Sequence, residues 1–186
     1  VMNDNYLRFA LEKVDGRYRS LGEAVQIAKN HTYQTSADII NNRKFALLGD
    51  PALTLAYPKL EVVPKHINGK ELAAPQDTLG ATDAVTITGA VQNNSGAVQT
   101  DFNGTIYLTL FDKPQNITTL ANDAGSQPAT FQAQQAVLFK GKATAQAGLF
   151  TFQFKLPKDI NYQYGFGKLS FYAEDGLRDG NGYYDK

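Results

Sequence analysis

The strongest constraint on the fold is a set of segments in which apolar and polar residues alternate. The clearest runs from Phe150 to Leu156, where Phe and Leu alternate with Thr, Gln and Lys. Similar segments are Val85–Val91, Ile106–Leu110 and Leu169–Ala173, with a shorter one at Val137–Phe139. Because successive side chains of a strand point to opposite faces, this pattern predicts antiparallel strands with one buried and one solvated face.

Turn-forming residues separate these predicted strands. They occur at Asn93–Gly96, Asn103-Gly104, Gly141, Gly148 and Pro157–Asp159. Short strands with such punctuation favour an all-β immunoglobulin-like sandwich, which we place at residues 59–186. We expect Gly89 to mark a bulge, Asn116–Thr130 to form a mobile loop, and Gly180–Tyr184 to lead into a final strand that is missing.

The first third of the chain reads as helical. Apolar residues recur at helical spacing over Asn3–Val14, and Asp15-Gly16 supplies a stop. Ser20 and Glu23 have the spacing of a capping box, which predicts a second helix ending near Asn30. A further helical turn or two is expected in Ser36–Asn42.

Phe45–Leu48 is a short, unbroken apolar run closed by Gly49-Asp50-Pro51. Such runs are typical of a strand buried on both faces of a parallel sheet. Two helices and one strand are too few for a separate α/β domain. Residues 1–58 therefore read as the remnant of an α/β domain. Leu60–Val63 is expected to be extended and Pro64–Thr78 to be a polar connection.

Composition excludes several classes of function. The chain of 186 residues has 18 basic and 18 acidic residues and no basic run, which argues against nucleic acid or an anionic membrane as partner. It has no cysteine, so disulfides, thiolate metal sites and a cysteine nucleophile are excluded. No apolar run approaches the roughly 20 residues of a membrane-spanning helix. The start, Val-Met-Asn-Asp, is no signal peptide, so we expect an internal excision whose leader lies upstream.

Few polar residues are candidates for chemistry. His31, expected just after a helix end, and His66, in the polar connection, have no thiol or serine elbow to pair with, so surface roles are favoured. Asp50 follows the predicted buried strand, where α/β sites often lie. A structural role, accepting local backbone hydrogen bonds, is favoured over one at an active-site rim.

The acidic, glycine-rich tail Glu174–Gly182 raises the question of calcium. Asp175 and Asp179 are the candidate ligands, but the spacing fails the EF-hand pattern, which ends in a bidentate Glu. A solvated loop is therefore favoured, and no cofactor is expected.

Aromatic residues are frequent near the end of the chain: Tyr162, Tyr164, Phe166, Tyr172, Tyr183 and Tyr184. They suit either a carbohydrate platform or core and cross-strand pairs, and their place among alternating strands favours the core. Tyr162 or Tyr164, just before a late strand, is a candidate tyrosine corner.

The segment Asn41–Leu53, with its Leu-Gly-Asp-Pro-Ala-Leu core, resembles the end of the catalytic domain in gingipain-type cysteine peptidases. Within that family it is most similar to the sortases of the type IX secretion system. Other matches occur in the expected order: Gly22–Ala24 with Ala28-Lys29, Phe102–Gly104, Phe111–Lys113, Leu156–Ile160 and Gly167–Ala173. The resemblance thus extends from the second predicted helix nearly to the end of the chain.

The resemblance implies a caspase-like catalytic domain with a His–Cys dyad, followed by an immunoglobulin-like domain. Both dyad residues should precede residue 1, and neither His31 nor His66 matches the context of the catalytic His. No catalytic residue is carried over, and this chain alone is not expected to be an enzyme. The parent would be an exported, outer-membrane-associated endopeptidase or transpeptidase that removes the C-terminal sorting domains of cargo and helps attach cargo to lipopolysaccharide.

The implied partners are the upstream catalytic domain, outer-membrane components of the secretion system, and cargo. If the parent sheet is cut, Phe45–Leu48 is expected to be exposed, disordered or paired with another copy. Two other interpretations stay open. One is a free-standing adhesion or carbohydrate-binding module with an exposed aromatic patch, and the other is a secretion-associated spacer without a ligand.

Overall fold

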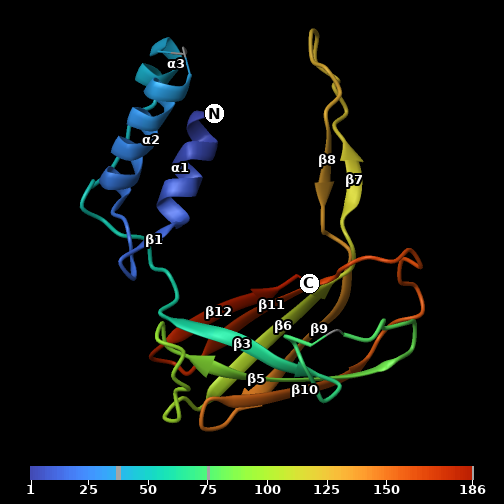
Figure 1. Ribbon diagram of the computed structural model, residues 1–186. Helices are drawn as coiled ribbons and strands as arrows, with labels where there is room; N and C mark the ends of the chain where they lie inside the picture. Colours follow the sequence, from blue (N-terminus) through green and yellow to red (C-terminus); the bar gives the residue numbers. More distant parts are fainter. Residues whose placement is uncertain (37–38, 75, 186) are drawn as a thin grey trace. The chain divides into compact units, whose positions relative to one another are not determined.

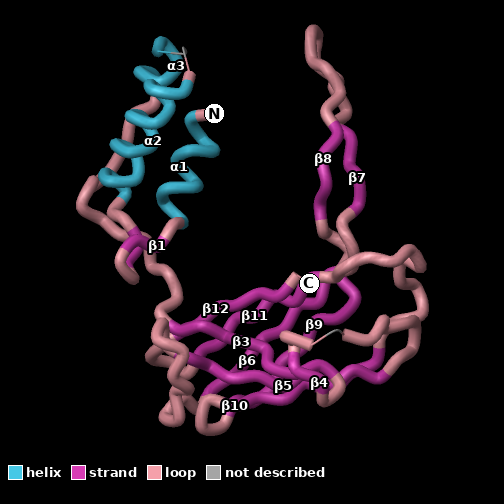
Figure 2. The backbone as a smooth tube through the Cα atoms, viewed as in Figure 1, coloured by secondary structure: helices cyan, strands magenta, loops and turns pink. Residues whose placement is uncertain are grey.

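The computed structural model describes residues 1–36, 39–74 and 76–185, without the side chain of Asn41, and it forms two compact units (Figure 1). Unit 1 is Val1–Tyr57 and unit 2 is Pro58–Lys186. The sequence placed the boundary one residue later, after residue 58. Unit 1 is mostly helical and unit 2 is all β (Figure 2).

Unit 1 consists of helices and one short hairpin. The helices are α1 (Met2–Leu11), α2 (Leu21–Thr35) and α3 (Ile39–Lys44), and strands β1 (Lys13–Val14) and β2 (Arg17–Tyr18) separate the first two. The first helix therefore ends three residues before the predicted Val14. Asp15 and Gly16 have φ angles of 52° and 77°. Positive φ at both central residues suits the two-residue turn of a hairpin, so these residues close a hairpin after the helix has ended.

The capping box at the start of α2 is confirmed. The Ser20 hydroxyl accepts a hydrogen bond from the Glu23 N–H, and the Glu23 carboxylate accepts one from the Ser20 N–H. The helix continues five residues beyond the predicted end at Asn30. Its last turns are held by packing on α1, since Thr32 is buried and its hydroxyl accepts a 2.8 Å hydrogen bond from Asn5. His31 consequently lies inside α2, not after its end.

Glu23 makes unit 1 sensitive to acid. The Arg17 guanidinium and the Ser20 N–H both donate to its carboxylate, which lowers the pKa of Glu23 to about 2. Because the folded-state pKa lies below the unfolded value, this stabilisation is complete above about pH 4.5 and is lost as the pH falls toward 2. We expect helical circular dichroism at 222 nm to decline over that window. The 222 nm signal of the Glu23→Gln variant should decline less over the same pH range. Equal declines in the variant and the unmodified protein would contradict this assignment.

Phe45–Leu48 is not a strand, so the prediction of a buried parallel strand is wrong. The segment belongs to no helix or strand, and the Leu48 side chain is 93% exposed. The chain then folds back onto the start of α2, where Leu21 and Gly22 donate to the carbonyls of Leu53 and Pro51. A parallel strand needs a neighbouring strand to pair with, and the described residues of unit 1 form no strands other than the two-residue ones of the hairpin.

Unit 2 is built from the strands β3 (Leu60–Ile67), β4 (Lys70–Glu71), β5 (Ala84–Gln92), β6 (Gly104–Phe111), β7 (Gln115–Thr118), β8 (Thr130–Ala133), β9 (Val137–Ala145), β10 (Leu149–Lys155), β11 (Lys168–Glu174) and β12 (Asp179–Tyr184). The main sheet has the order β10-β5-β3-β12-β11-β6-β9, with β4 added to β3. Strands β7 and β8 form a separate two-stranded sheet. Neighbours are antiparallel except β12 and β3, which pair in parallel at Gly180–Leu60 and Asn181–Glu61.

The main sheet folds around one hydrophobic core, in a sandwich-like arrangement. Most of the inward side chains are those predicted from the alternation, whereas Leu60, Val62, Phe102 and Ala145 were not predicted. The fully buried large side chains are Val62, Ile87, Val91, Phe102, Ile106 and Leu108. Phe150 and Phe152 on β10 meet Phe171 on β11 with ring centroids 5.7 and 6.4 Å apart. These contacts join β10, at one end of the sheet order, to β11 across the core.

Several boundaries differ from the prediction. Strand β3 runs on through Pro64 to Ile67, with a register shift between Pro64 and His66, so the expected polar connection begins later. The expected mobile loop, Asn116–Thr130, begins within β7 and ends at the first residue of β8, and these two strands pair with each other. Gly180–Tyr184 is itself most of strand β12 and lies inside the sheet.

Gly89 lies beside a bulge, as expected, but the extra residue is on the partner strand: Gly89 pairs with Pro64 and its neighbour Thr88 pairs with His66, so Lys65 of β3 is left over. On its other side, Gly89 pairs in register with Phe150 on β10. A Cβ at this position would collide with the Phe150 ring and would lie 2.6 Å from the Val63 carbonyl oxygen. The glycine is therefore explained by the close approach of the Phe150 ring.

Candidate functional site

The polar residues singled out from the sequence make local contacts. The His31 ring meets Phe9 edge-on with centroids 5.5 Å apart. The His66 Nδ1 atom lies 3.2 Å from the Thr88 hydroxyl on the neighbouring strand. Asp50 accepts a 2.8 Å hydrogen bond from the Ala52 N–H, as expected for a structural turn residue. These contacts do not assemble a catalytic group.

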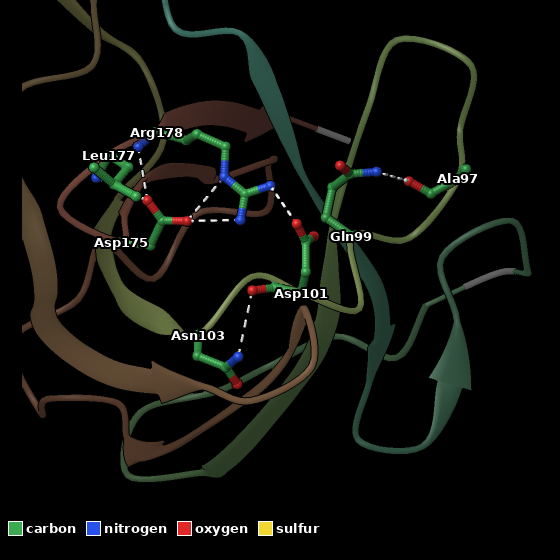
Figure 3. A network of polar contacts seen from close by, with 7 residues as sticks. All are labelled: Ala97, Gln99, Asp101, Asn103, Asp175, Leu177 and Arg178. Atoms are coloured by element: carbon green, nitrogen blue, oxygen red, sulfur yellow. Dashed lines mark hydrogen bonds and ion pairs between the residues drawn. The ribbon is translucent and has the colours of Figure 1, made fainter.

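The most connected polar cluster in unit 2 surrounds Arg178, in the turn between β11 and β12 (Figure 3). Its Nε and Nη2 atoms donate to Asp175 Oδ2 at 2.9 and 2.8 Å, and its Nη1 atom donates to Asp101 at 3.0 Å. The guanidinium carbon lies 5.7 Å from the centroid of the buried Phe102 ring. Arg178 therefore ties the β11–β12 turn to the segment that precedes β6.

The charges of this cluster are mutually stabilised. Burial alone would raise the pKa of Asp175, but hydrogen bonds from the Arg178 and Leu177 N–H groups and from the Arg178 side chain lower it. The carboxylates of Asp175 and Asp101 raise the pKa of Arg178. Sequence reasoning treated Asp175 as a calcium candidate and missed its pairing with Arg178, three residues later.

The pairing bears directly on calcium. Both oxygens of Asp175 already accept hydrogen bonds, so a cation there would have to displace the guanidinium. In the part of the chain that the structure describes, no group of three or more His, Asp and Glu side chains is placed to hold a metal. The expectations about calcium and cofactors stay predictions.

Arg178 is expected to stabilise unit 2 through its paired hydrogen bonds. Lysine keeps the charge but cannot bond a carboxylate in a bidentate manner, so Arg178→Lys should lower the midpoint of thermal unfolding and Arg178→Ala should lower it further. Calorimetry of the whole chain checks this order, with Lys140→Ala, an exposed cation on β9, as the control. An unchanged midpoint in Arg178→Ala would refute the role.

A second cluster surrounds Asp112, immediately after β6. Its Oδ1 atom accepts from the Lys113 N–H at 2.8 Å and lies 2.7 Å from the Lys113 ammonium, while Oδ2 accepts from the Asn161 N–H at 2.8 Å. Burial opposes the charge, but the hydrogen bonds from Lys113 and Asn161 outweigh it and lower the pKa of Asp112. Sequence reasoning used Asp112 only within the family resemblance. A carboxylate directly before a lysine at a strand end was the available signal.

An open, polar groove of about 520 Å³ lies beside Asp112. Its walls are the start of β9, at Ala136–Leu138, and the segment from Pro157 to Asn161. The Asp112 carboxylate is already satisfied by its partners, so it fixes the Pro157–Asn161 segment and is not a free base.

The aromatic residues near the end of the chain are mostly outside the core, which corrects the sequence interpretation. The side chains of Tyr162, Tyr164 and Phe166 are 77%, 91% and 70% exposed. They lie in the loop between β10 and β11, where the alternation that buries every second residue of a strand does not apply. The Tyr162 hydroxyl donates to the Lys158 carbonyl at 2.9 Å, as in a tyrosine corner, but its ring is solvated.

Comparison with known proteins relates the chain to one peptidase family. The profile of peptidase family C25, the gingipain family, matches residues 1–56. The crystal structure of dimeric latent PorU from Porphyromonas gingivalis aligns with 95% of this chain at 29% identity and a TM-score of 0.59. The chain spans only 17% of the length of that protein.

Other comparisons add little. The sporulation control protein Spo0M from Bacillus subtilis covers 70% of this chain and 49% of its own length, at 17% identity and a TM-score of 0.35. That similarity is too low to bear on fold or function. No curated protein sequence matches the chain. Among the described residues, no helix has the length and apolar character needed to cross a bilayer.

Proposed function

From the relation of this chain to the gingipain-type cysteine peptidases of family C25, we propose that it is a non-catalytic region of a larger cysteine peptidase. Unit 1 would be the closing part of a caspase-like catalytic domain, and unit 2 an immunoglobulin-like sandwich that braces it. The chain has no cysteine, so the nucleophile must come from elsewhere in such a protein.

The observation that carries the proposal is the surface of unit 1. Among the described residues of unit 1, the buried apolar side chains are Met2, Ala10, Ala24 and Ala28, and many of its large apolar side chains are exposed. The exposed ones are Val1, Leu7, Leu11, Tyr33, Ile39, Ile40, Leu48, Leu53 and Leu55. A small core with so much exposed apolar surface is typical of a piece that packs against a further element.

The segment Phe45–Leu48 indicates how unit 1 would pack against the rest of the proposed parent protein. The segment is apolar, and within unit 1 it has no strand partner among the described residues. In the proposed parent it would pair with the sheet of the catalytic domain and bury Leu48. Such pairing would give the segment in the parent protein the buried position that it does not have in this structure.

The topology of unit 2 supports the immunoglobulin-like assignment. Its main sheet divides at the short parallel contact into β10-β5-β3 and β12-β11-β6-β9. The chain crosses between these halves from β5 to β6, from β9 to β10 and from β10 to β11. A three-strand and a four-strand layer joined by such crossings is the arrangement of an immunoglobulin-type sandwich.

The similarity to type IX sortases suggests the wider role. The parent would be exported to the bacterial cell surface, would remove C-terminal sorting domains from secreted cargo, and would contact outer-membrane components of that system. This chain would contribute to that activity by packing against the catalytic domain and presenting it to the secretion system.

The experiment is to sequence the coding region upstream of Val1 and to express the longer protein. We expect a His and a Cys in strand-end contexts there. Backbone amides of Phe45–Leu48 should exchange rapidly with solvent in the present chain and become protected in the longer protein. An upstream region without the dyad would overturn the proposal, as would reproducible peptide cleavage by the present chain alone.

A matched pair of variants sharpens this test. Leu48→Asp should leave the unfolding midpoint of the present chain unchanged, because Leu48 is solvated, and should lower that of the longer protein, where the carboxylate would be buried. Leu120→Asp is the control, since Leu120 is 88% exposed in unit 2 and should be neutral in both proteins. Equal behaviour of the two variants in the longer protein would contradict the proposed packing.

A further inference from the structure

The outer face of β6, β11 and β12 carries an ordered group of aromatic and polar side chains. Tyr107, Tyr172 and Asn181 lie directly opposite one another on the three strands. Two residues to either side of Tyr172, on the same face, Glu174 pairs with Asp179 and Ser170 pairs with Tyr183. We call the set Tyr107, Tyr172, Tyr183, Glu174, Asp179 and Asn181 the tyrosine face.

The tyrosine rings present free surface. Tyr107 and Tyr172 are 40% and 43% exposed, and Tyr183 is 72% exposed. The Tyr107 and Tyr172 ring centroids are 6.2 Å apart, whereas the stacked pair Tyr18 and Tyr57 in unit 1 is separated by 3.8 Å. The two rings on the tyrosine face therefore lie beside each other, and neither covers the other.

The polar groups around these rings are held in place. The Tyr107 hydroxyl donates to the Glu174 carboxylate at 3.0 Å, and this hydrogen bond raises the pKa of Tyr107. Burial and the charges of Asp179 and Glu174 raise the pKa of Tyr172. The β11–β12 turn beside Glu174 and Asp179 is fixed by the Arg178 cluster. Binding would thus order few side chains, which favours affinity.

The chemistry of the face restricts its ligand. The tyrosine face has no aliphatic side chain, so it does not fit a lipid surface or an apolar protein core. Its carboxylates are accompanied by Lys142 on β9, which pairs with Tyr107, so the surface carries both signs of charge and favours neither an anionic nor a cationic polymer. Flat aromatic rings suit the C–H faces of pyranose sugars, and neighbouring carboxylate and amide groups suit their hydroxyls.

We propose that the tyrosine face binds a neutral oligosaccharide. The tyrosine rings would stack on successive sugar rings, while Glu174, Asp179 and Asn181 would bond to sugar hydroxyls. The proposal rests on unit 2 alone and is independent of the peptidase relation, because a sandwich within a larger enzyme can still bind glycans.

The test uses the whole chain with cellohexaose, maltohexaose and chitohexaose, each at up to about 10 mM. Because the chain has ten tyrosines and no tryptophan, ligand contact with the face can be followed by tyrosine fluorescence as well as by calorimetry. We expect at least one hexasaccharide to bind with a millimolar or tighter dissociation constant. Failure of all three to bind would overturn the proposal.

Variants locate the binding. Tyr172→Ala should weaken it at least about tenfold, and Tyr183→Ala, at a more exposed position, should weaken it without threatening the fold. Tyr33→Ala, in α2, is the matched control and should change nothing, since Tyr33 is an exposed tyrosine on unit 1. Unchanged affinity in both Tyr172→Ala and Tyr183→Ala, or equal loss in Tyr33→Ala, would refute the assignment.

Discussion

Replacing Phe102 by alanine is expected to lower the free energy of unfolding of unit 2 by about 3–5 kcal/mol. Phe102 is fully buried in the core cluster, and the Arg178 guanidinium lies over its ring. The substitution removes the apolar contacts and leaves a cavity beneath the Asp101–Arg178–Asp175 cluster. Denaturant unfolding followed by circular dichroism of the β-sheet would measure the change.

The control is a second Phe→Ala substitution in the same unit. Phe166 is 70% exposed in the β10–β11 loop, so Phe166→Ala should change the free energy of unfolding by less than about 0.5 kcal/mol. If Phe102→Ala lowered the free energy of unfolding as little as Phe166→Ala, Phe102 would not be part of the core.

Replacing Gly182 by alanine is expected to destabilise unit 2 by about 3 kcal/mol, toward the upper end of overpacking effects. A Cβ on Gly182 would overlap the carbonyl oxygen of Val62 and would lie 2.8 Å from its carbonyl carbon. The obstacle is backbone, which cannot rotate away as a side chain can. Either β12 or β3 must move at the place where they are joined by only two paired positions.

Gly80→Ala is the matched control for this substitution. A Cβ there would meet only the Asp83 carboxylate, at an ordinary distance of 3.5 Å, and the backbone of Gly80 does not need positive φ. Thermal unfolding of the two variants should separate them clearly. A Gly182→Ala protein with the native midpoint would contradict the close approach of β12 to β3.

The strands of unit 2 were the part of the fold that the sequence predicted best. Alternation identified β5, β6, β10 and β11 because each has one face in the core and one in solvent. It missed β7 and β8, whose residues are mostly solvated on both faces, and it read β12 as a loop because of its glycines. Those glycines are explained by the approach of β3, a contact between residues far apart in sequence.

Unit 1 shows a different limit of sequence reasoning. The capping box at Ser20 is a local signal, and it was read correctly. The apolar run at Phe45–Leu48 was read as a buried strand, but burial of such a run depends on neighbouring strands that unit 1 does not supply. Local pattern indicates which residues can be buried, while the surrounding chain decides whether they are.

The candidate sites were the least predictable. Arg178 and Asp112 act through partners brought close by folding, Asp101 and Asn161, which lie 77 and 49 positions away along the chain. The tyrosine face likewise depends on the register that sets Tyr107 against Tyr172. Composition indicated that tyrosines were abundant, but only the strand pairing distinguishes a core tyrosine from one on an outer face.

The parallel contact of β3 and β12 has a mechanical consequence. These are the first and last strands of unit 2, and they run in the same direction, so tension applied to the two flanking segments would pull the strands lengthwise past each other. In that geometry the interstrand bonds are loaded together and do not open one by one. With so short a contact, the resistance would come from the core side chains behind it, and unit 2 would yield under load by sliding before its hairpins unzip.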